Sequence, residues 1–295
     1  MAGGNGSRND VTEYASRCRP AWLRALGHDD PPDEITVDGE SYRRVDIYKH
    51  DSWAATALYE SVSPVAKTRR IIGKFNRRQS LLGLPGAWIG RLLARREAHF
   101  LSRLAETGFV PRLCGAVWAE GRLLPNAVAR KFIDGHALKC RERTSDEFFG
   151  RLREVLRAIH AYDVAYVDLH KHENVLVGAD GRPYLIDFQV SFGLMPTWWG
   201  RSRPARLALQ MLQRMDDYIL TKLHRRHRRD QCPLSQSELE ASRPMLVRVH
   251  RRLAAPLRQA RRRLLVLLGV RARRGKVESE RFVEVGLREP ISTAA

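Results

Sequence analysis

The chain has 295 residues, and 52 Lys and Arg residues against 33 Asp and Glu residues give it a formal net charge of +19. Hydrophobic residues make up 43% of the sequence, which excludes an intrinsically disordered chain and predicts one large domain or two lobes. No apolar run approaches the roughly 20 residues that a membrane-spanning helix needs, and the polar first ten residues predict no secretory signal.

The first half of the chain is expected to be rich in strands. A flexible lead-in is predicted over residues 1–34. Three apolar segments with strand character follow it, at residues 42–48, 54–59 and 68–75. A stripe of apolar side chains then predicts a helix over 88–104, and a short apolar strand is predicted at 128–133.

The second half combines helices with one hairpin. Thr144 and Glu147 have the spacing of a capping box, and apolar residues then repeat with helical period. Two apolar runs, at 175–177 and 183–188, flank an Asp-Gly turn and predict a β-hairpin. The rest, 204–270, is predicted to be helical and is rich in arginine.

This order of elements predicts an α+β fold with two lobes, a small antiparallel-sheet N-lobe and a larger helical C-lobe. The expected domain organisation is a lead-in over 1–34, the N-lobe over 35–135, the C-lobe with its arginine-rich helices over 136–275, and a tail over 276–295. The change of lobe is expected near Gly135, where an apolar strand gives way to an Asp-Gly pair.

Three polar residues surround the predicted hairpin. Asn174 stands immediately before its first strand and Asp187 follows its second, so the turn returns them to one site. An amide oxygen and a carboxylate oxygen are hard ligands that suit Mg²⁺. Asp168 lies just upstream, where a carboxylate could accept a proton from an acceptor hydroxyl.

Residues 166–188 resemble the catalytic and metal-binding loops of the protein-kinase-like superfamily. The approach, with Ile159-His160, then Val164, then Asp168, repeats that family's phasing. The resemblance implies a two-lobed kinase fold, ATP as phosphoryl donor and Mg²⁺ as cofactor. It also implies site roles: Asp168 and Lys171 are catalytic, and Asn174 and Asp187 hold the metal.

One spacing departs from the family pattern. The kinase family usually places the asparagine five residues after the catalytic aspartate, whereas six separate Asp168 from Asn174 here. The extra residue falls around Leu169 or His170, and it leaves the aim of Asp168 open.

The lysine that would hold the nucleotide phosphates can be sought among only eight lysines. Lys74 ends an apolar strand and resembles the lysine of the family's third strand, while Lys67, next to a Ser-Pro pair, is a rival. Glu97 lies inside the apolar stripe of the following helix, where a carboxylate is costly unless it is paired. A Lys74–Glu97 ion pair is therefore expected; the alternative is that Glu97 reaches water at the edge of the stripe.

Two family features are missing. The first hairpin, at residues 49–56, contains no glycine, so the usual approach of backbone amides to phosphates is in question. The metal loop has Gln189 where a glycine is usual, and no Ala-Pro-Glu follows. These departures point to atypical and bacterial branches, RIO-like kinases and lipopolysaccharide core kinases. Residues 129–135 resemble the hinge at which adenine binds, although an ordinary edge strand and turn would look the same.

The expected function is ATP- and Mg²⁺-dependent transfer of the γ-phosphoryl group to a hydroxyl on a protein Ser or Thr or on a lipopolysaccharide core sugar. Residues 201–276 hold 21 basic and 5 acidic residues, which makes an anionic membrane surface a candidate partner, unless the arginines reflect compositional bias. Scattered cysteines predict a cytoplasmic protein, peripheral on the inner face of the membrane if that surface is bound. A pseudokinase scaffold is the alternative; a basic nucleic-acid-binding protein is weaker, because no aromatics interleave the basic residues and no specific nucleic acid is expected.

Overall fold

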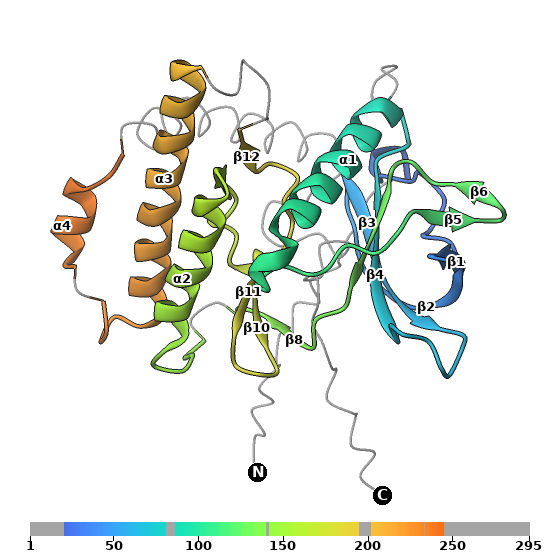
Figure 1. The fold of residues 1–295 in the computed structure, drawn as a ribbon, viewed down its shortest axis with the longest axis horizontal. Coiled ribbons are helices and arrows are strands. Elements are labelled where there is room, and N and C mark those ends of the chain that lie inside the picture. Colours follow the sequence, from blue (N-terminus) through green and yellow to red (C-terminus); the bar gives the residue numbers. More distant parts are fainter. Residues whose placement is uncertain (1–20, 81–85, 140–141, 195–201, 233, 245–295) are drawn as a thin grey trace, which may run out of the picture.

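A computed structural model describes residues 21–80, 86–139, 142–194, 202–232 and 234–244. Within them the chain forms an antiparallel sheet at one end and a group of helices at the other, with a long helix between (Figure 1). The predicted α+β class, with a sheet lobe and a helical lobe, is confirmed. Predictions for residues 1–20 of the lead-in, for the arginine-rich helices beyond 244 and for the tail over 276–295 lie outside the described residues.

The larger sheet has seven strands in the order β6-β5-β1-β2-β3-β4-β7, and all neighbouring strands are antiparallel. Its strands are β1 (Glu34–Val37), β2 (Glu40–His50), β3 (Ala54–Ser61), β4 (Arg70–Asn76), β5 (Val117–Ala119), β6 (Arg122–Leu123) and β7 (Ala127–Lys131). The four predicted strand segments correspond to β2, β3, β4 and β7. The short strands β1, β5 and β6 carry too few residues to show a period and were not predicted.

Successive side chains of β4 point to opposite faces of the sheet, and the two faces have different partners. Ile71 and Phe75 are buried in the apolar cluster on one face of the sheet, whereas Ile72 and Lys74 point to the opposite face. The helix α1 (Ala87–Leu104) runs across that opposite face, close to the predicted bounds 88–104. A short 3-10 helix, η1 (Ala21–Leu23), precedes the first strand of the sheet. A second one, η2 (Ala105–Thr107), follows α1 directly.

In its described residues, the helical lobe contains three α-helices, one 3-10 helix and two small sheets. Its helices are α2 (Phe148–Ala161), α3 (Arg203–His227), α4 (Gln236–Ala241) and the 3-10 helix η3 (His172–Asn174). Its strands are β8 (Gly135–Ala137), β9 (Val164–Ala165), β10 (Val175–Gly178), β11 (Pro183–Leu185) and β12 (Phe192–Gly193). The predicted hairpin is present as β10 and β11, with Val175 opposite Leu185.

One large core joins the two ends of the molecule. It contains the end of α1, the apolar face of α2 and residues from both sides of the β10–β11 hairpin. Leu152, Val155, Leu156 and Ile159, which the helical period predicted to face inward, are all fully buried in it. The core therefore holds α1 and the hairpin in fixed positions beside each other.

The predicted capping box at the start of α2 is wrong. The helix begins at Phe148, so Glu147 occupies the N-cap position itself and its carboxylate pairs with Arg151 one turn later. Thr144 lies outside the helix, is buried, and its backbone carbonyl accepts a hydrogen bond from Arg228 at 2.9 Å. A tertiary contact with the end of α3 therefore outweighs the local capping signal at Thr144.

Candidate active site

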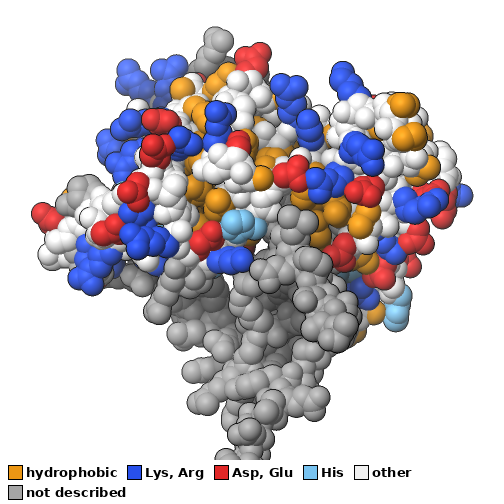
Figure 2. Space-filling model, turned by 90° about the horizontal axis from the view of Figure 1, so that it is seen from below, with side chains coloured by type: hydrophobic (Ala, Val, Ile, Leu, Met, Phe, Trp, Pro, Cys, Tyr) orange, Lys and Arg blue, Asp and Glu red, His pale blue; other side chains and the backbone are white. Residues whose placement is uncertain are grey.

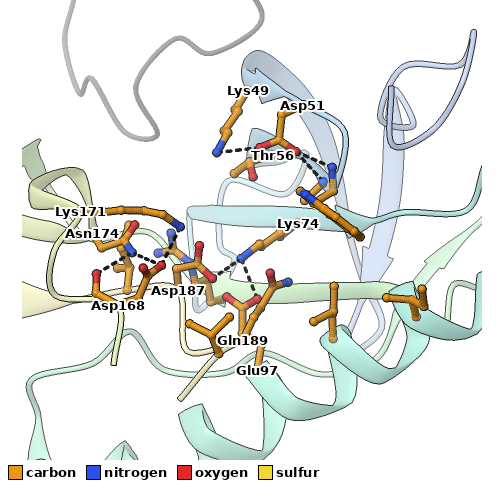
Figure 3. Close-up of a pocket in the computed structure, with 17 residues that line it drawn as sticks. Lys49, Asp51, Thr56, Lys74, Glu97, Asp168, Lys171, Asn174, Asp187 and Gln189 are labelled. Carbon is orange, nitrogen blue, oxygen red and sulfur yellow. Dashed lines mark hydrogen bonds and ion pairs between the residues drawn. The ribbon is translucent and has the colours of Figure 1, made fainter. Parts of the chain in front are cut away.

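A cavity of about 400 Å³ opens between the sheet and the β10–β11 hairpin, beside α1 (Figure 3). All six residues that the sequence singled out line this cavity: Lys74, Glu97, Asp168, Lys171, Asn174 and Asp187. Its volume lies within the range usual for small-molecule sites, roughly 300 to 1,000 Å³. The structure thus brings together residues that are separated by up to 113 positions in the chain.

Lys74 is the central cation of the cavity. Its Nζ lies 2.9 Å from Glu97 Oε2 on α1 and 2.9 Å from Asp187 Oδ1 after β11. The expected Lys74–Glu97 ion pair is therefore present, and Glu97 is only 1% exposed. The rival Lys67 lies outside β4, is exposed and is not among the residues that line the cavity.

The three charged groups perturb one another in physically consistent directions. Burial alone would lower the pKa of Lys74, but Asp187 and Glu97 together raise it well above its usual value. Enclosure would raise the pKa of Asp187, but the Lys74 ammonium holds it at about 2. Burial raises the pKa of Glu97, and Lys74 offsets only part of that effect. Asp187 is thus an anion at every physiological pH.

The turn that follows β9 positions a second group around Asp168. Lys171 Nζ lies 2.7 Å from Asp168 Oδ2, and the Asn174 amide donates to the same oxygen at 2.9 Å. His170 Nδ1 lies 3.2 Å from Asp168 Oδ1. The Asp168 carboxylate is 95% buried, so these contacts fix its orientation at the floor of the cavity.

The structure shows how the extra residue in this loop is accommodated. The amide of Lys171 donates to the carbonyl of Asp168 at 3.2 Å, which closes a turn around Leu169 and His170. Leu169 is fully buried in the core, whereas His170 is exposed. The added residue therefore bulges toward solvent, and Lys171 and Asn174 still reach Asp168.

The hairpin brings Asn174 beside the segment that follows β11 and contains Asp187. Val175 pairs with Leu185, and the amide of Ile186 donates to the carbonyl of Asn174 at 3.1 Å. Asp187 follows immediately, with φ of 64°, a left-handed backbone that non-glycine residues seldom adopt. Asn174 and Asp187 consequently face the same part of the cavity (Figure 3).

Asp216 on α3 holds the loop from behind, and sequence reasoning missed it. Its buried carboxylate accepts hydrogen bonds from the amides of Tyr166 at 2.7 Å and Val167 at 2.8 Å, and lies 3.3 Å from His160 Nε2. Val167 has φ of 70°, a strained value for a β-branched residue. A signal was available, because Asp216 lies in the inward stripe of α3 with Leu209 and Leu220, just as Glu97 lies in that of α1.

Gln189, the residue that replaces the usual glycine, has a structural partner. Its side-chain amide donates to the Asn76 Oδ1 at the end of β4. Its backbone carbonyl accepts from Arg96 Nε of α1 at 3.1 Å, and Arg96 also donates to the Ser191 carbonyl at 2.6 Å. Residues 189–191 are thus tied to both β4 and α1, which carry Lys74 and Glu97.

Over residues 132–134 the chain passes from β7 of the seven-stranded sheet to β8 of the small sheet that contains the β10–β11 hairpin. These residues lie within the predicted hinge segment. Phe132 packs in an apolar cluster with residues of β2, β3 and β4, while the next residue, Ile133, packs against a cluster that contains Leu176 and Ile186. Two apolar surfaces, one from each lobe, therefore meet at this crossing.

The donors near the hairpin suit a magnesium ion more than a metal held by protein alone. Among the described residues, no group of three or more His, Cys, Asp or Glu side chains could hold a metal ion. The available ligands are the Asp187 carboxylate and the Asn174 amide oxygen, both of which line the cavity. Mg²⁺ is typically bound by one or two such ligands, with substrate phosphates and water completing its shell.

The fold of this chain is similar to solved structures of other proteins. No protein-family model matches the chain, and no curated protein matches it. The crystal structure of the Rio2 kinase from Chaetomium thermophilum is similar at 15% identity and a TM-score of 0.45, over 64% of this chain and 59% of that chain. The ADP/Mg²⁺–phosphoaspartate complex of that kinase is similar at 15% identity and a TM-score of 0.45, over 70% and 61% of the two chains. The match thus spans about three fifths of the Rio2 chains.

Proposed function

We propose that the protein is a kinase that uses ATP and Mg²⁺ to phosphorylate a hydroxyl group. The observation that carries this proposal is the position of Lys74 Nζ, 2.9 Å from both Glu97 and Asp187 in the cavity that also contains Asp168. The two carboxylates outweigh the single ammonium, so this group suits a polyphosphate that binds together with Mg²⁺, for which Asp187 is a ligand of the preferred type. The likeness to Rio2 kinase structures is in keeping with this proposal but does not support it independently.

The apolar clusters at the hinge would hold the adenine ring. Phe132 belongs to the cluster of the sheet lobe, and Ile133 packs against that of the helical lobe. A flat heterocycle between these surfaces would place its phosphates toward Lys74. The charged part of the cavity would then receive the charged part of the nucleotide.

Asn174 and Asp187 would hold Mg²⁺ through one amide oxygen and one carboxylate oxygen. Bound there, Mg²⁺ would neutralise charge on the β- and γ-phosphates. The low pKa of Asp187, about 2, keeps this ligand ionised. Lys74, which Asp187 contacts in the structure, would turn toward the α- and β-phosphates while Glu97 retains it.

Asp168 would orient the acceptor hydroxyl and accept its proton. The acceptor oxygen would form a bond to the γ-phosphorus, the bond from that phosphorus to the β–γ bridging oxygen would break, and ADP would leave. Lys171, 2.7 Å from Asp168, would offset charge on the transferred phosphoryl group. Catalysis of this kind depends on position and electrostatics more than on covalent chemistry.

The acceptor is a hydroxyl of a protein Ser or Thr or of a lipopolysaccharide core sugar. The face shown in Figure 2 does not choose between them, because Lys and Arg side chains on it are interspersed with Asp and Glu. No helix in the described part of the chain is long and apolar enough to cross a membrane. An anionic membrane surface remains a proposed partner, to be tested with the acceptor.

The test is phosphoryl transfer from γ-labelled ATP with Mg²⁺ into protein and lipid fractions of cells. We expect label in one fraction with the wild-type protein, and its loss in Asp187→Ala and Asp168→Asn. Asp217→Ala, which removes an exposed carboxylate on α3, is the matched control and should transfer label normally. A wild-type protein that binds ATP but transfers no label would be a scaffold, and full transfer by Asp187→Ala would exclude the proposed site.

A further inference from the structure

The hairpin between β2 and β3 lines the cavity, and two backbone amides at its tip are already bonded to a side chain of the protein. Asp51 stands at its tip, and Asp51 Oδ1 accepts hydrogen bonds from the amides of Trp53 at 2.6 Å and Ala54 at 2.9 Å. The amide of Asp51 in turn donates to the carbonyl of Ala54 at 3.0 Å. Glycine-rich loops present such amides to phosphate. Here a carboxylate of the protein's own chain already occupies them.

The second oxygen of this carboxylate binds a lysine. Lys49 Nζ lies 2.8 Å from Asp51 Oδ2, and the Asp51 side chain is only 16% exposed. Burial would raise the pKa of Asp51, but Lys49 and the two amides lower it below its usual value. Among the described residues, Asp51 at the hairpin tip is therefore a held anion whose ion-pair partner is Lys49, which sits at the end of a long flexible side chain.

Lys49 faces the cavity together with the proposed phosphate and metal residues. It pairs with Thr56 across the hairpin, and Lys49, Asp51 and Thr56 all line the cavity that contains Lys74 and Asp187. Figure 3 shows its ammonium on the side of the hairpin that faces Lys171 and Asp187. Its charge also contributes to the low pKa of Asp187, so it lies within electrostatic reach of the metal loop.

We propose that Lys49 is the residue through which this hairpin binds the β- and γ-phosphates of ATP. When no nucleotide is bound, Asp51 accepts hydrogen bonds from the amides of Trp53 and Ala54 and forms an ion pair with Lys49. When ATP binds, the Lys49 ammonium leaves Asp51 and contacts the phosphates, while Asp51 keeps its two amide hydrogen bonds. A charged side chain thereby replaces the amide cradle of a glycine-rich loop. This inference rests on the proposed kinase function and adds to it a phosphate-binding residue outside the predicted set.

The test is the affinity of the full chain for ATP, ADP and AMP with Mg²⁺, measured by calorimetry for matched variants. Lys49→Met should weaken ATP binding by roughly tenfold to a hundredfold, the range expected for a lost bond to a charged group. It should leave AMP binding nearly unchanged. Lys49→Arg should keep ATP affinity, and Lys67→Met, at an exposed lysine in the same lobe, should match the wild type.

Asp51→Asn should act in the opposite direction. An asparagine Oδ1 still accepts from both amides but carries no charge, so ATP affinity should rise by about threefold. A purely structural hairpin would lose affinity in both variants. Equal losses for AMP and ATP in Lys49→Met, or unchanged ATP affinity, would overturn this inference alone. Failure of the wild-type protein to bind ATP would overturn the kinase proposal and this inference with it.

Discussion

The ammonium of Lys74 lies between two carboxylates that come from different parts of the chain, Glu97 on α1 and Asp187 after β11. Because Glu97 is almost fully buried, its ionised form depends on nearby cations, chiefly Lys74 and to a smaller extent Arg130. The arrangement makes Lys74 a structural residue as well as a proposed phosphate ligand. The two roles can be separated by measuring stability without nucleotide.

Lys74→Met should reduce the free energy of unfolding by about 3–5 kcal/mol near neutral pH, as expected when one partner of a buried ion pair is removed. The loss should be smaller at about pH 5 than at about pH 8. Without Lys74, the pKa of the buried Glu97 carboxyl in the folded protein rises further above its pKa in the unfolded chain. A carboxyl with a raised folded-state pKa lowers the free energy of unfolding as pH rises from its unfolded-state pKa through its folded-state pKa. Urea unfolding at the two pH values measures the difference.

The pH dependence reports on both carboxylates that Lys74 contacts. In the wild type Lys74 holds the pKa of Asp187 at about 2, so the contribution of Asp187 to stability is lost only as pH falls through about 2. Without Lys74, enclosure raises the pKa of Asp187 as burial raises that of Glu97, so both carboxylates make the loss of stability larger at the higher pH. Lys67→Met, at an exposed lysine, should unfold like the wild type at both pH values. An effect of Lys74→Met that does not depend on pH would contradict the ion-pair explanation.

At the scale of elements, periodic patterns predicted the structure well wherever burial is one-sided. The helical stripe of residues 88–104 gave α1 within one residue, and it also located Glu97 on the inward face. The Asp-Gly turn predicted the β10–β11 hairpin, which brings Asn174 and Asp187 together. These signals depend only on residues close together in the sequence, so they could be recognised without knowing which distant segments pack against them.

Contacts between distant segments could not be predicted in this way. Thr144 has the local signature of a cap, yet its carbonyl binds Arg228 from α3. The anchoring of residues 166–167 depends on Asp216, and the occupation of the hairpin amides depends on the backbone conformation that Asp51 stabilises. Sequence spacing alone gives neither the orientation of a carboxylate nor the amides that reach it.

The contact between α1 and the end of β4 gives a prediction about glycine. A Cβ at Gly90 would lie 2.0 Å from the backbone oxygen of Arg77, so α1 packs there only because the residue has no side chain. Gly90→Ala should destabilise the protein and shift α1, which carries Glu97. Gly150→Ala on α2 is the matched control, because nothing lies within 4 Å of the added Cβ.

The two alanine variants should have opposite effects. Helix propensity alone favours alanine over glycine by about 0.5–1 kcal/mol, and Gly150→Ala should gain about that much. Gly90→Ala should instead lose stability, since the clashing atom belongs to the backbone and cannot rotate away. Thermal unfolding of both variants measures the difference. Equal stabilisation by both would show that α1 is free to move relative to β4.

At the scale of the whole molecule, one large core already joins the two lobes. At the crossing from β7 to β8, the Arg70 side chain of β4 pairs with Asp134, and its guanidinium lies 4.6 Å from the centre of the Phe132 ring. The pair is partly exposed, so it contributes little to stability in water. A ligand that contacts residues on both sides of the cavity would add a further link between the lobes to that core.

Mg²⁺ and ATP together should raise the thermal midpoint of the wild-type protein. The proposed site takes Lys74 from the sheet lobe and Asn174 and Asp187 from the helical lobe, so unfolding of either lobe would release the ligand. At a concentration about 100 times the dissociation constant the gain is about 2.7 kcal/mol, which corresponds to roughly 4 °C for a chain of this size. With ATP present, the thermal midpoint of Asp187→Ala should be the same with Mg²⁺ as with a chelator, because the proposed metal ligand has been removed. The control variant Asp217→Ala should respond to Mg²⁺ as the wild type does. Scanning fluorimetry tests this, and a metal-dependent shift that persists in Asp187→Ala would place the ion elsewhere.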